Sequence, residues 1–271
     1  MAQRMPAVFV GHGSPQVALW DDDPFVLALR AFGARLPRPQ AIVVVSAHWQ
    51  EGPPFRVTAS PAPRLIYDFS GFPPKLHRFV HPCPGAPALA ADLLARLGAA
   101  GLEAIPDPER GLDHGVWVPL HLLFPRTPIP VVALSLLPDD AAAVERAGRA
   151  LAPLREQGIL LLGSGGVVHN LGRLAWQDKA APVEGWARDF DAWARQRIAA
   201  HDGEGLRRRA GAPAAALAVP STEHFDPILF VLGAADPGEP VVWLYEGFHY
   251  GTLSLRSFAF GGPASSPQPQ P

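Results

Sequence analysis

Continuous apolar runs alternate along this chain with longer stretches of helical periodicity, and this alternation constrains the fold more than any other feature. Runs such as Ala41–Ser46 and Ile159–Leu162 do not alternate between polar and apolar residues. That pattern is typical of strands buried on both faces of a sheet. Such strands need packed helices to cover them. The sequence therefore predicts an α/β domain with a central sheet covered by helices.

The expected elements follow one another without an internal repeat. Strands are expected at Ala7–Val10, Ala41–Ser46, Phe55–Ala59, Ile129–Leu134, Ile159–Leu162, Val241–Tyr245 and Leu253–Phe260. Helices are expected at Pro24–Arg35, Pro87–Ala99, Val116–Leu123, Asp139–Glu156, Glu184–Ala200 and Glu223–Ala234. The Pro-rich segment from Gly52 to Gly85 is too long for a plain connector, so it is a candidate for shaping a pocket.

Composition excludes several classes of protein. Hydrophobic residues make up 48% and charged residues 18% of the 271 residues, which is the balance of a folded domain. The formal net charge of −2 and the lack of a dense basic block predict that the chain has no nucleic-acid partner. No run approaches the ~18 apolar residues of a membrane span, so no membrane association is expected.

We expect one catalytic domain over residues 1–260 and a disordered tail over residues 261–271, which are rich in Pro and Ser. A single cysteine, Cys83, excludes an internal disulfide. The N-terminal residues lack the apolar core of a signal peptide. The cytoplasm is therefore the expected compartment.

Three of the ten histidines lie shortly after the carboxyl ends of predicted strands, namely His12, His48 and His169. Open α/β sheets bind ligands at that edge. Neutral imidazole is the commonest side-chain metal ligand. The placement of these three histidines therefore indicates a shared metal site.

His114 and His224 are two further candidates. His114 precedes a predicted helix, and His224 lies in a segment where Ser221 or Thr222 is expected to cap the helix that follows. The remaining histidines are expected in loops, in packing or at the surface; they are His77, His81, His121, His201 and His249.

Two other chemistries have only partial signals. Gly163–Gly166 follows a predicted strand like a phosphate-binding loop, but it lacks the last glycine of the dinucleotide pattern and any following Gly-Lys pair. Ser164 does not fit a hydrolase nucleophile elbow, because Leu162 stands where that motif needs glycine. Neither a nucleotide site nor a serine nucleophile is expected.

A set of motifs occurs in one order along the chain: GHGSP at Gly11–Pro15, SAHW at Ser46–Trp49, YDFSGFP at Tyr67–Pro73, HPCPG at His81–Gly85, GLDHGVWVPL at Gly111–Leu120, GSGGVVHNL at Gly163–Leu171 and TEHFDP at Thr222–Pro227. Over nearly the whole chain, this ordered set resembles the class III extradiol aromatic-ring-opening dioxygenases, in the branch similar to DOPA 4,5-dioxygenase. The resemblance implies an α/β fold with a mainly mixed sheet. It also implies a mononuclear non-haem iron(II) centre, with zinc in some members.

The resemblance implies a role for each candidate histidine. The GHG and SAHW histidines of the family bind metal, which here means His12 and His48. A late acidic or histidine position completes the set, here His224. The HNL histidine, His169, is implied to be the acid–base catalyst or a further ligand. The DHG histidine, His114, is implied to face the substrate or to support the site.

The third ligand is a choice between Glu223 and His224. Both precede the apolar run Ile228–Leu232, and adjacent residues near a helix start point about 100° apart. Only one of them is therefore expected to face the metal. The DOPA-dioxygenase branch points to His224, whereas more distant extradiol relatives use glutamate. Glu223 is then expected to be a carboxylate at a helix N-terminus. The chain departs from the family at His81, where a tyrosine is often found.

The expected function is extradiol cleavage of a small catecholic substrate with O2. Three protein ligands on one face of a metal leave positions open for both reactants. His169 is the expected base and His114 the expected hydrogen-bond donor to developing negative charge. Two alternatives stay open. One is a metal-dependent hydrolase or other non-oxidative metalloenzyme on the same scaffold. The other is a binding protein without turnover.

Overall fold

The structure, a computed structural model, describes residues 3–263. Within these residues, eight strands form one mixed sheet in the order β4-β3-β5-β2-β6-β1-β10-β7, and β8 and β9 form a separate pair. The strands are β1 Ala7–Gly11, β2 Ala41–Gln50, β3 Phe55–Thr58, β4 Ala104–Asp107, β5 Val131–Leu136, β6 Ile159–Gly165, β7 Val241–Tyr245, β8 Phe248–His249, β9 Leu253–Ser254 and β10 Ser257–Phe260. The predicted tail lies outside the described residues from residue 264 onward.

The centre of the sheet is parallel and its flanks are mixed. Strands β5, β2, β6 and β1 pair in parallel. On one side β10 and β7 continue antiparallel. On the other side β3 runs antiparallel to β5, while β4 runs parallel to β3. The predicted α/β domain with a mixed central sheet is therefore confirmed.

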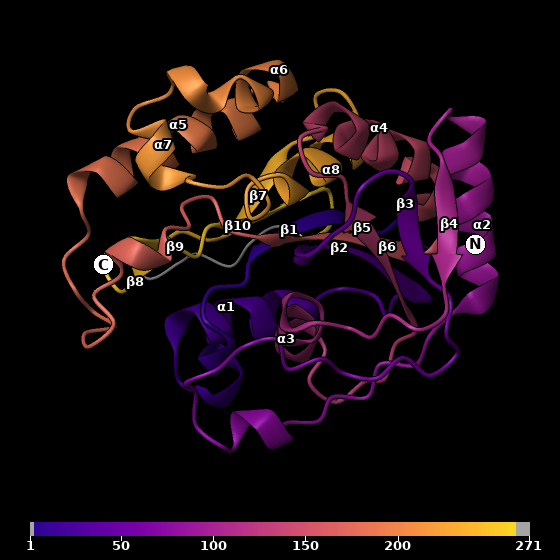
Figure 1. Ribbon diagram of the computed structural model, residues 1–271, viewed down its shortest axis with the longest axis horizontal. Coiled ribbons are helices and arrows are strands. Elements are labelled where there is room, and N and C mark those ends of the chain that lie inside the picture. Colours follow the sequence, from indigo (N-terminus) through magenta and orange to yellow (C-terminus); the bar gives the residue numbers. More distant parts are fainter. Residues whose placement is uncertain (1–2, 264–271) are drawn as a thin grey trace.

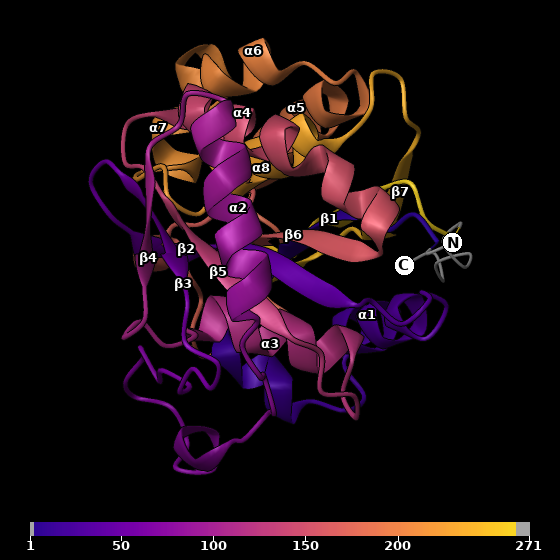
Figure 2. The same ribbon diagram turned by 90° about the vertical axis from the view of Figure 1, so that its right-hand side faces the viewer.

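Helices cover both faces of this sheet (Figures 1 and 2). The α-helices are α1 Pro24–Gly33, α2 Pro87–Ala99, α3 His114–Leu123, α4 Ala141–Leu151, α5 Gly185–Ala199, α6 Gly203–Arg207, α7 Ala215–Ala218 and α8 Pro227–Ala234. The 3-10 helices are η1 Pro15–Leu19, η2 Leu76–Arg78, η3 Ala152–Gln157, η4 Leu171–Arg173 and η5 Arg209–Gly211. Helices α1 and α3 pack on one face, and α2, α4 and α8 on the other.

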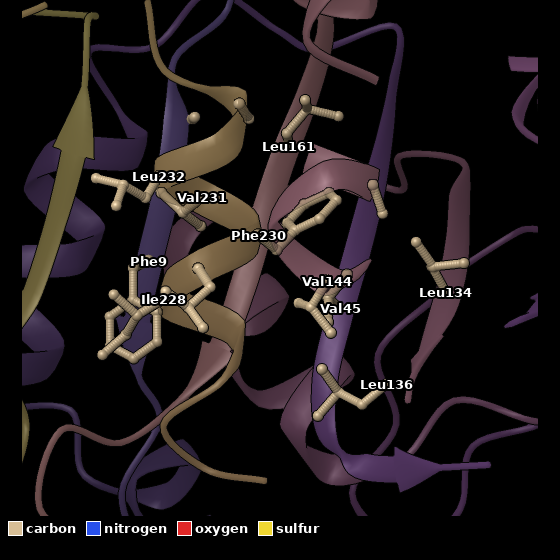
Figure 3. Packing of buried hydrophobic residues seen from close by; sticks show 14 of the residues in the cluster. Phe9, Val45, Leu134, Leu136, Val144, Leu161, Ile228, Phe230, Val231 and Leu232 are labelled. Atoms are coloured by element: carbon tan, nitrogen blue, oxygen red, sulfur yellow. The ribbon is translucent and has the colours of Figure 1, made fainter. Parts of the chain in front are cut away.

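The apolar helix α8 is central to the second face. Ile228, Phe230 and Val231 are fully buried in the same cluster as Val144 of α4, and Figure 3 shows their side chains projecting from α8 in different directions. Burying one such side chain contributes roughly 1.5–3 kcal/mol relative to leaving it exposed. The packing fixes the start of α8, and with it the turn that precedes this helix.

Several element boundaries differ from the prediction. Helix α8 begins at Pro227, because proline suits the first turn of a helix and residues 223–226 form a turn. The strand predicted over Leu253–Phe260 is divided into β9 and β10. Strand β4 was not predicted, since it is a half-exposed edge strand that contains Pro106. Among residues 3–263, no helix combines the length and apolar character of a membrane span.

Candidate metal centre

The carboxyl ends of β1, β2 and β6 meet at one edge of the sheet, since Gly11 pairs with Gly165 and Ser46 with Ser164. His12 follows β1 directly, and its backbone N–H donates to the Gly165 carbonyl oxygen at 3.0 Å. The predicted edge therefore carries the first candidate histidine.

His48 lies inside β2 and does not follow it, because this strand continues to Gln50. The expectation that all three histidines follow their strands is therefore wrong for His48. The ladder between β2 and β6 nevertheless ends at Ser46. His48 thus lies beyond the part of β2 that pairs with β6 and reaches the same edge, while Gln50 pairs with Leu136 of β5.

The imidazoles of His12, His48 and His224 converge there. Ligand atoms of the three rings lie within 4.8 Å of one another. Nε2 of His12 and Nε2 of His48 are 3.2 Å apart. Nε2 of His224 is buried and has no hydrogen-bond partner in the described part of the chain. An unpartnered buried ring nitrogen close to two other ring nitrogens fits a metal ion, because the ion would supply the partner that Nε2 of His224 lacks.

The opposite nitrogen of each ring faces an oxygen. Nδ1 of His12 shares a hydrogen bond of 2.8 Å with Ser164 Oγ, and Nδ1 of His224 lies 3.1 Å from Oε1 of Glu223. Nδ1 of His48 lies 3.3 Å from Oδ2 of Asp68. Oxygens behind the ring are typical of metal-ligating histidines, since they fix the tautomer that leaves Nε2 free.

Burial keeps these imidazoles neutral. It lowers the pKa of His12 and of His224 well below the ordinary value, and neighbouring histidines lower both further. Burial, with His114 close by, lowers the pKa of His48 to about 3. All three rings are therefore unprotonated at neutral pH, which is the form that binds metal.

His114 is the first residue of α3 and lies beside this cluster, with its ring centroid 4.0 Å from that of His48. Its backbone N–H and its Nδ1 both contact Oδ1 of Asp68, at 3.0 and 2.9 Å. Burial would raise the pKa of Asp68, but the hydrogen bonds from His114 outweigh it and lower that pKa to about 2. An ionised carboxylate only accepts, so Nδ1 of His114 donates and Nε2 is left available to a bound molecule.

His169 lies beyond the end of β6 and packs against His224. Burial, followed by the influence of His48, lowers the pKa of His169 to about 4. The ring is therefore neutral at pH 7 and able to accept a proton. The backbone N–H of His169 donates to Ala218 at 3.0 Å, which holds the loop against the segment that leads to His224.

Glu223 lies behind His224 in the turn before α8. Its Oε1 accepts from Ser221 Oγ at 2.8 Å and faces Nδ1 of His224. Helix α8 begins at Pro227, four residues after Glu223, so the expectation that Glu223 stands at a helix N-terminus is wrong. The expected capping of α8 by Ser221 or Thr222 is also wrong, because the N-cap residue is Asp226. Turn geometry, and not helical spacing, separates the two adjacent side chains.

Gly115 permits the close approach of α3 to β2. A Cβ at this position would clash with Ser46 Oγ and would lie 3.0 Å from Cδ2 of His48. Ser46 in turn donates to the buried Asp113 at 2.6 Å, and Arg110 donates to Asp113 and to the carbonyl oxygen of His48. Asp113, through Ser46, and Arg110, through the His48 carbonyl oxygen, thus hold the backbone around His48.

A cavity of about 480 Å³ opens above the histidines. Five histidines line it: His12, His48, His114, His169 and His224. Its apolar lining includes Phe69, Phe72, Leu171, Trp176 and the buried Leu253. The volume lies in the usual range for a small-molecule site, roughly 300–1,000 Å³.

With this geometry in place, comparisons with known proteins decide the family. Residues 6–261 match the family described as the catalytic LigB subunit of aromatic ring-opening dioxygenase.

This chain belongs to the LigB family of aromatic ring-opening dioxygenases.

Relatives within this family are similar along almost their whole length. The chain is 40% identical to 4,5-DOPA dioxygenase extradiol of Escherichia coli K12, covering 95% of each chain. It is 35% identical to the protein of that name from Beta vulgaris, covering 93% of this chain and 95% of the relative. The crystal structure of an uncharacterized Escherichia coli K12 protein superposes with a TM-score of 0.79 at 37% identity, covering 95% of this chain and all of the other.

The LigB-family site also contains a residue that the sequence analysis did not single out. Asp68 lies in the YDFSGFP motif, which by itself assigns no role to this aspartate. A single aspartate in a long irregular segment carries no periodic signal. The length of the Gly52–Gly85 segment was the available hint, and Asp68, Phe69 and Phe72 of this segment do line the pocket.

The remaining histidines lie outside this pocket. His77 is exposed, His81 is buried against His121, and His249 is buried beside Asp23. His201 is half-buried, contrary to the expected surface position, because its Nε2 pairs with the Glu239 carbonyl oxygen at 2.8 Å.

Proposed function

We propose that this chain is a metal-dependent dioxygenase that opens a catecholic ring in extradiol fashion and takes both oxygen atoms from O2. The observation that carries the proposal is the convergence of three neutral imidazoles in a cavity that His114 and His169 also line. Membership of the ring-opening family supports the reaction class. We assign the activity to residues 1–260 and the cytoplasm as its compartment.

His12, His48 and His224 are the proposed metal ligands, with Fe(II) as the native metal and Zn(II) as the competitor for the same nitrogens. A bound Fe(II) would supply a redox-active Lewis acid that holds both reactants and acidifies a catechol hydroxyl. Holding two reactants in one orientation removes much of the entropic barrier. His169 is a further ligand only if its loss removes the metal.

His169 is the proposed general base. Its ring lines the cavity beside His224 and is neutral at pH 7. In this role it takes a proton from the second catechol hydroxyl and returns it later in the reaction. Its ring stacks on that of His224, and its ligand atoms, with those of Glu223 and His224, form a second group close enough to hold a metal.

His114 is the proposed hydrogen-bonding partner of the reacting oxygens. With Nδ1 donating to Asp68, Nε2 accepts a proton from a reacting group and can then donate it to an oxygen that gains negative charge. Phe69 and Phe72 line the cavity, and the ring of Phe69 lies against that of His114 with centroids 5.5 Å apart, so these apolar rings would keep water from this side of the reacting oxygens.

The decisive experiment combines metal analysis with oxygen uptake. Protein purified without oxygen is reconstituted with Fe(II) or with Zn(II), and both forms are assayed with a panel of catechols in an oxygen electrode. Uptake with the absorbance of a ring-cleavage product, in the Fe(II) form only, is expected. Hydrolysis of ester or amide substrates without oxygen uptake would instead make the protein a metal-dependent hydrolase. Binding of catechols without either reaction would make it a binding protein.

A further inference from the structure

Asp68 contacts both flanking histidines at once. Its Oδ1 accepts from the backbone and the ring of His114, and its Oδ2 lies 3.3 Å from Nδ1 of His48. Its side chain is 23% exposed, and its main chain lies at the surface. We propose that Asp68 is the positioning residue that sets the tautomer of both rings, so that His48 presents Nε2 to the metal and His114 presents Nε2 to the substrate. This role rests on the proposed function.

The loop that carries Asp68 is anchored by the two residues that precede it, Ile66 and Tyr67. Ile66 donates its N–H to the Leu112 carbonyl oxygen at 2.7 Å, and Trp117 Nε1 donates to the Ile66 carbonyl oxygen at 3.1 Å. The hydroxyl of Tyr67 donates to the Phe79 carbonyl oxygen at 2.5 Å. The carboxylate is thus delivered to the N-terminus of α3 by backbone contacts that do not involve the histidines.

The charge of Asp68 has a second partner in α3. The backbone N–H of His114 is one of the free donors at a helix N-terminus, where a carboxylate is favoured by the helix dipole. The adjacent Asp113 makes no side-chain cap, and its carboxyl is engaged with Ser46 and Arg110. Asp68 therefore fills the capping role from a distant segment, and this holds the carboxylate ionised and fixed between two rings.

The test determines, in the metal-free protein, which ring nitrogen of each histidine carries the hydrogen. Long-range ¹H–¹⁵N spectra of ¹⁵N-histidine-labelled protein should show both His48 and His114 with the hydrogen on Nδ1. In Asp68→Asn, which preserves shape but not charge, the two rings should become tautomer mixtures, and Co(II) affinity should fall about 10- to 100-fold. Asp68→Glu should restore part of the Nδ1–H tautomer and part of the Co(II) affinity. Asp21→Asn, an exposed aspartate paired with Arg30, is the matched control and should change neither.

The wild-type spectrum alone is able to overturn the proposal. An Nε2–H tautomer at either ring in the wild-type protein, or unchanged tautomers and Co(II) affinity in Asp68→Asn, would show that Asp68 only anchors the loop. Because these readouts need no turnover, a protein that fails the oxygen-uptake assay but shows the expected tautomers would count against the proposed reaction and not against the role of Asp68.

Two large apolar side chains that line the cavity are also exposed to solvent. Leu171 and Trp176 are 52% and 46% exposed and line the cavity together with the half-buried Phe72. Among residues 3–263, no lysine or arginine lines the cavity, and its one carboxylate, Asp68, is engaged by histidines. A carboxylate on the substrate would therefore lose water without gaining a cation.

We infer that the preferred substrates are catechols with an uncharged apolar substituent that extends over Leu171 and Trp176. This inference also rests on the proposed function. Such a substituent would cover the exposed apolar side chains of Leu171 and Trp176, and exposed apolar patches of this kind mark ligand-binding surfaces. It would distinguish the chain from its relatives named for DOPA, whose substrate carries an ammonium and a carboxylate.

The test uses a pair of ligands that differ in charge, 4-propylcatechol and 3-(3,4-dihydroxyphenyl)propanoate. We expect the apolar ligand to have kcat/KM and anaerobic affinity higher by about tenfold or more. Leu171→Arg should reduce this ratio, whereas Leu27→Arg, at an exposed leucine of α1 outside the cavity, should not. A ratio of one or less in the wild type would overturn the inference. Anaerobic binding decides it even if neither ligand is turned over.

Discussion

The imidazole rings of His169 and His224 stack face to face, with centroids 3.4 Å apart and planes 6° from parallel. One ring comes from the loop after β6 and the other from the turn before α8. A hydrogen bond connects the two segments, since the Gly166 N–H donates to the His224 carbonyl oxygen at 2.7 Å. A Cβ on Gly165 would clash with that same carbonyl oxygen. The proposed base is thus held against a proposed ligand.

Replacing His169 should separate binding from chemistry. In His169→Gln we expect turnover to fall about 10²-fold or more, which is the usual contribution of a general base. Metal content should remain close to stoichiometric, because the other three rings are untouched. Metal analysis alongside kcat measures both. Loss of metal in proportion to activity would instead make His169 a ligand and transfer the acid–base role to His114.

The two strand-borne histidines should be indispensable for the metal. His12→Ala and His48→Ala are each expected to lose most of the metal affinity while the circular dichroism spectrum is retained. His201→Asn is the control, since His201 pairs with Glu239 away from the cavity. Metal titration of the three variants gives the answer, and stoichiometric binding by both alanine variants would place the metal site elsewhere.

The choice between Glu223 and His224 can be tested by comparing their deletions. His224→Ala removes the orphaned Nε2 and should abolish metal binding. Glu223→Ala removes only an oxygen behind the ring, so we expect metal to bind at full stoichiometry with affinity about 10- to 100-fold lower. Titration with Co(II) distinguishes the two. The reverse pattern would make the Glu223 carboxylate the ligand.

Gly115→Ala should damage the site through packing alone. The new methyl group would press on Ser46 and His48, and overpacking of this kind costs about 1–3 kcal/mol in the free energy of unfolding. Gly98→Ala is the matched control, because nothing lies near its Cβ in α2. Alanine there should stabilise the protein by about 0.5–1 kcal/mol. Urea denaturation of both variants measures the difference, and equal stabilities would contradict the close approach of α3 to β2.

His81 should make the protein sensitive to mild acid. Burial, with His121 nearby, lowers the pKa of His81 from its ordinary value of 6.5 to about 4. Between these values the unfolded chain takes up a proton that the folded chain does not, so this residue's contribution to stability is lost as the pH falls from about 6.5 to about 4. The slope is at most about 1.4 kcal/mol per pH unit. Urea midpoints between pH 7 and pH 5 should fall less steeply in His81→Gln, and an unchanged slope would contradict the prediction.

The sequence by itself determined the α/β class, most of the strands and the strands that reach the site, but not the order of the strands in the sheet. Apolar runs specify buried strands through short-range patterns, and the predicted ranges of β1, β7 and α2 are close to those observed. His12 was placed correctly for the same reason, because it directly follows a strand whose parallel partner is also predictable. Proline at the start of α8 and the continuation of β2 to Gln50 moved boundaries by only a few residues.

Only the tertiary structure decided how the side chains around those strands are arranged. Asp68 and His114 are 46 residues apart in sequence, and no local pattern connects them. The stacking of His169 on His224 and the place of Glu223 behind the ring likewise depend on a turn and a loop that long-range contacts hold together. Periodicity arises from neighbouring residues, so the sequence specifies helices and strands. The geometry of a site arises from the packing of distant segments, which becomes fixed only when the chain is folded.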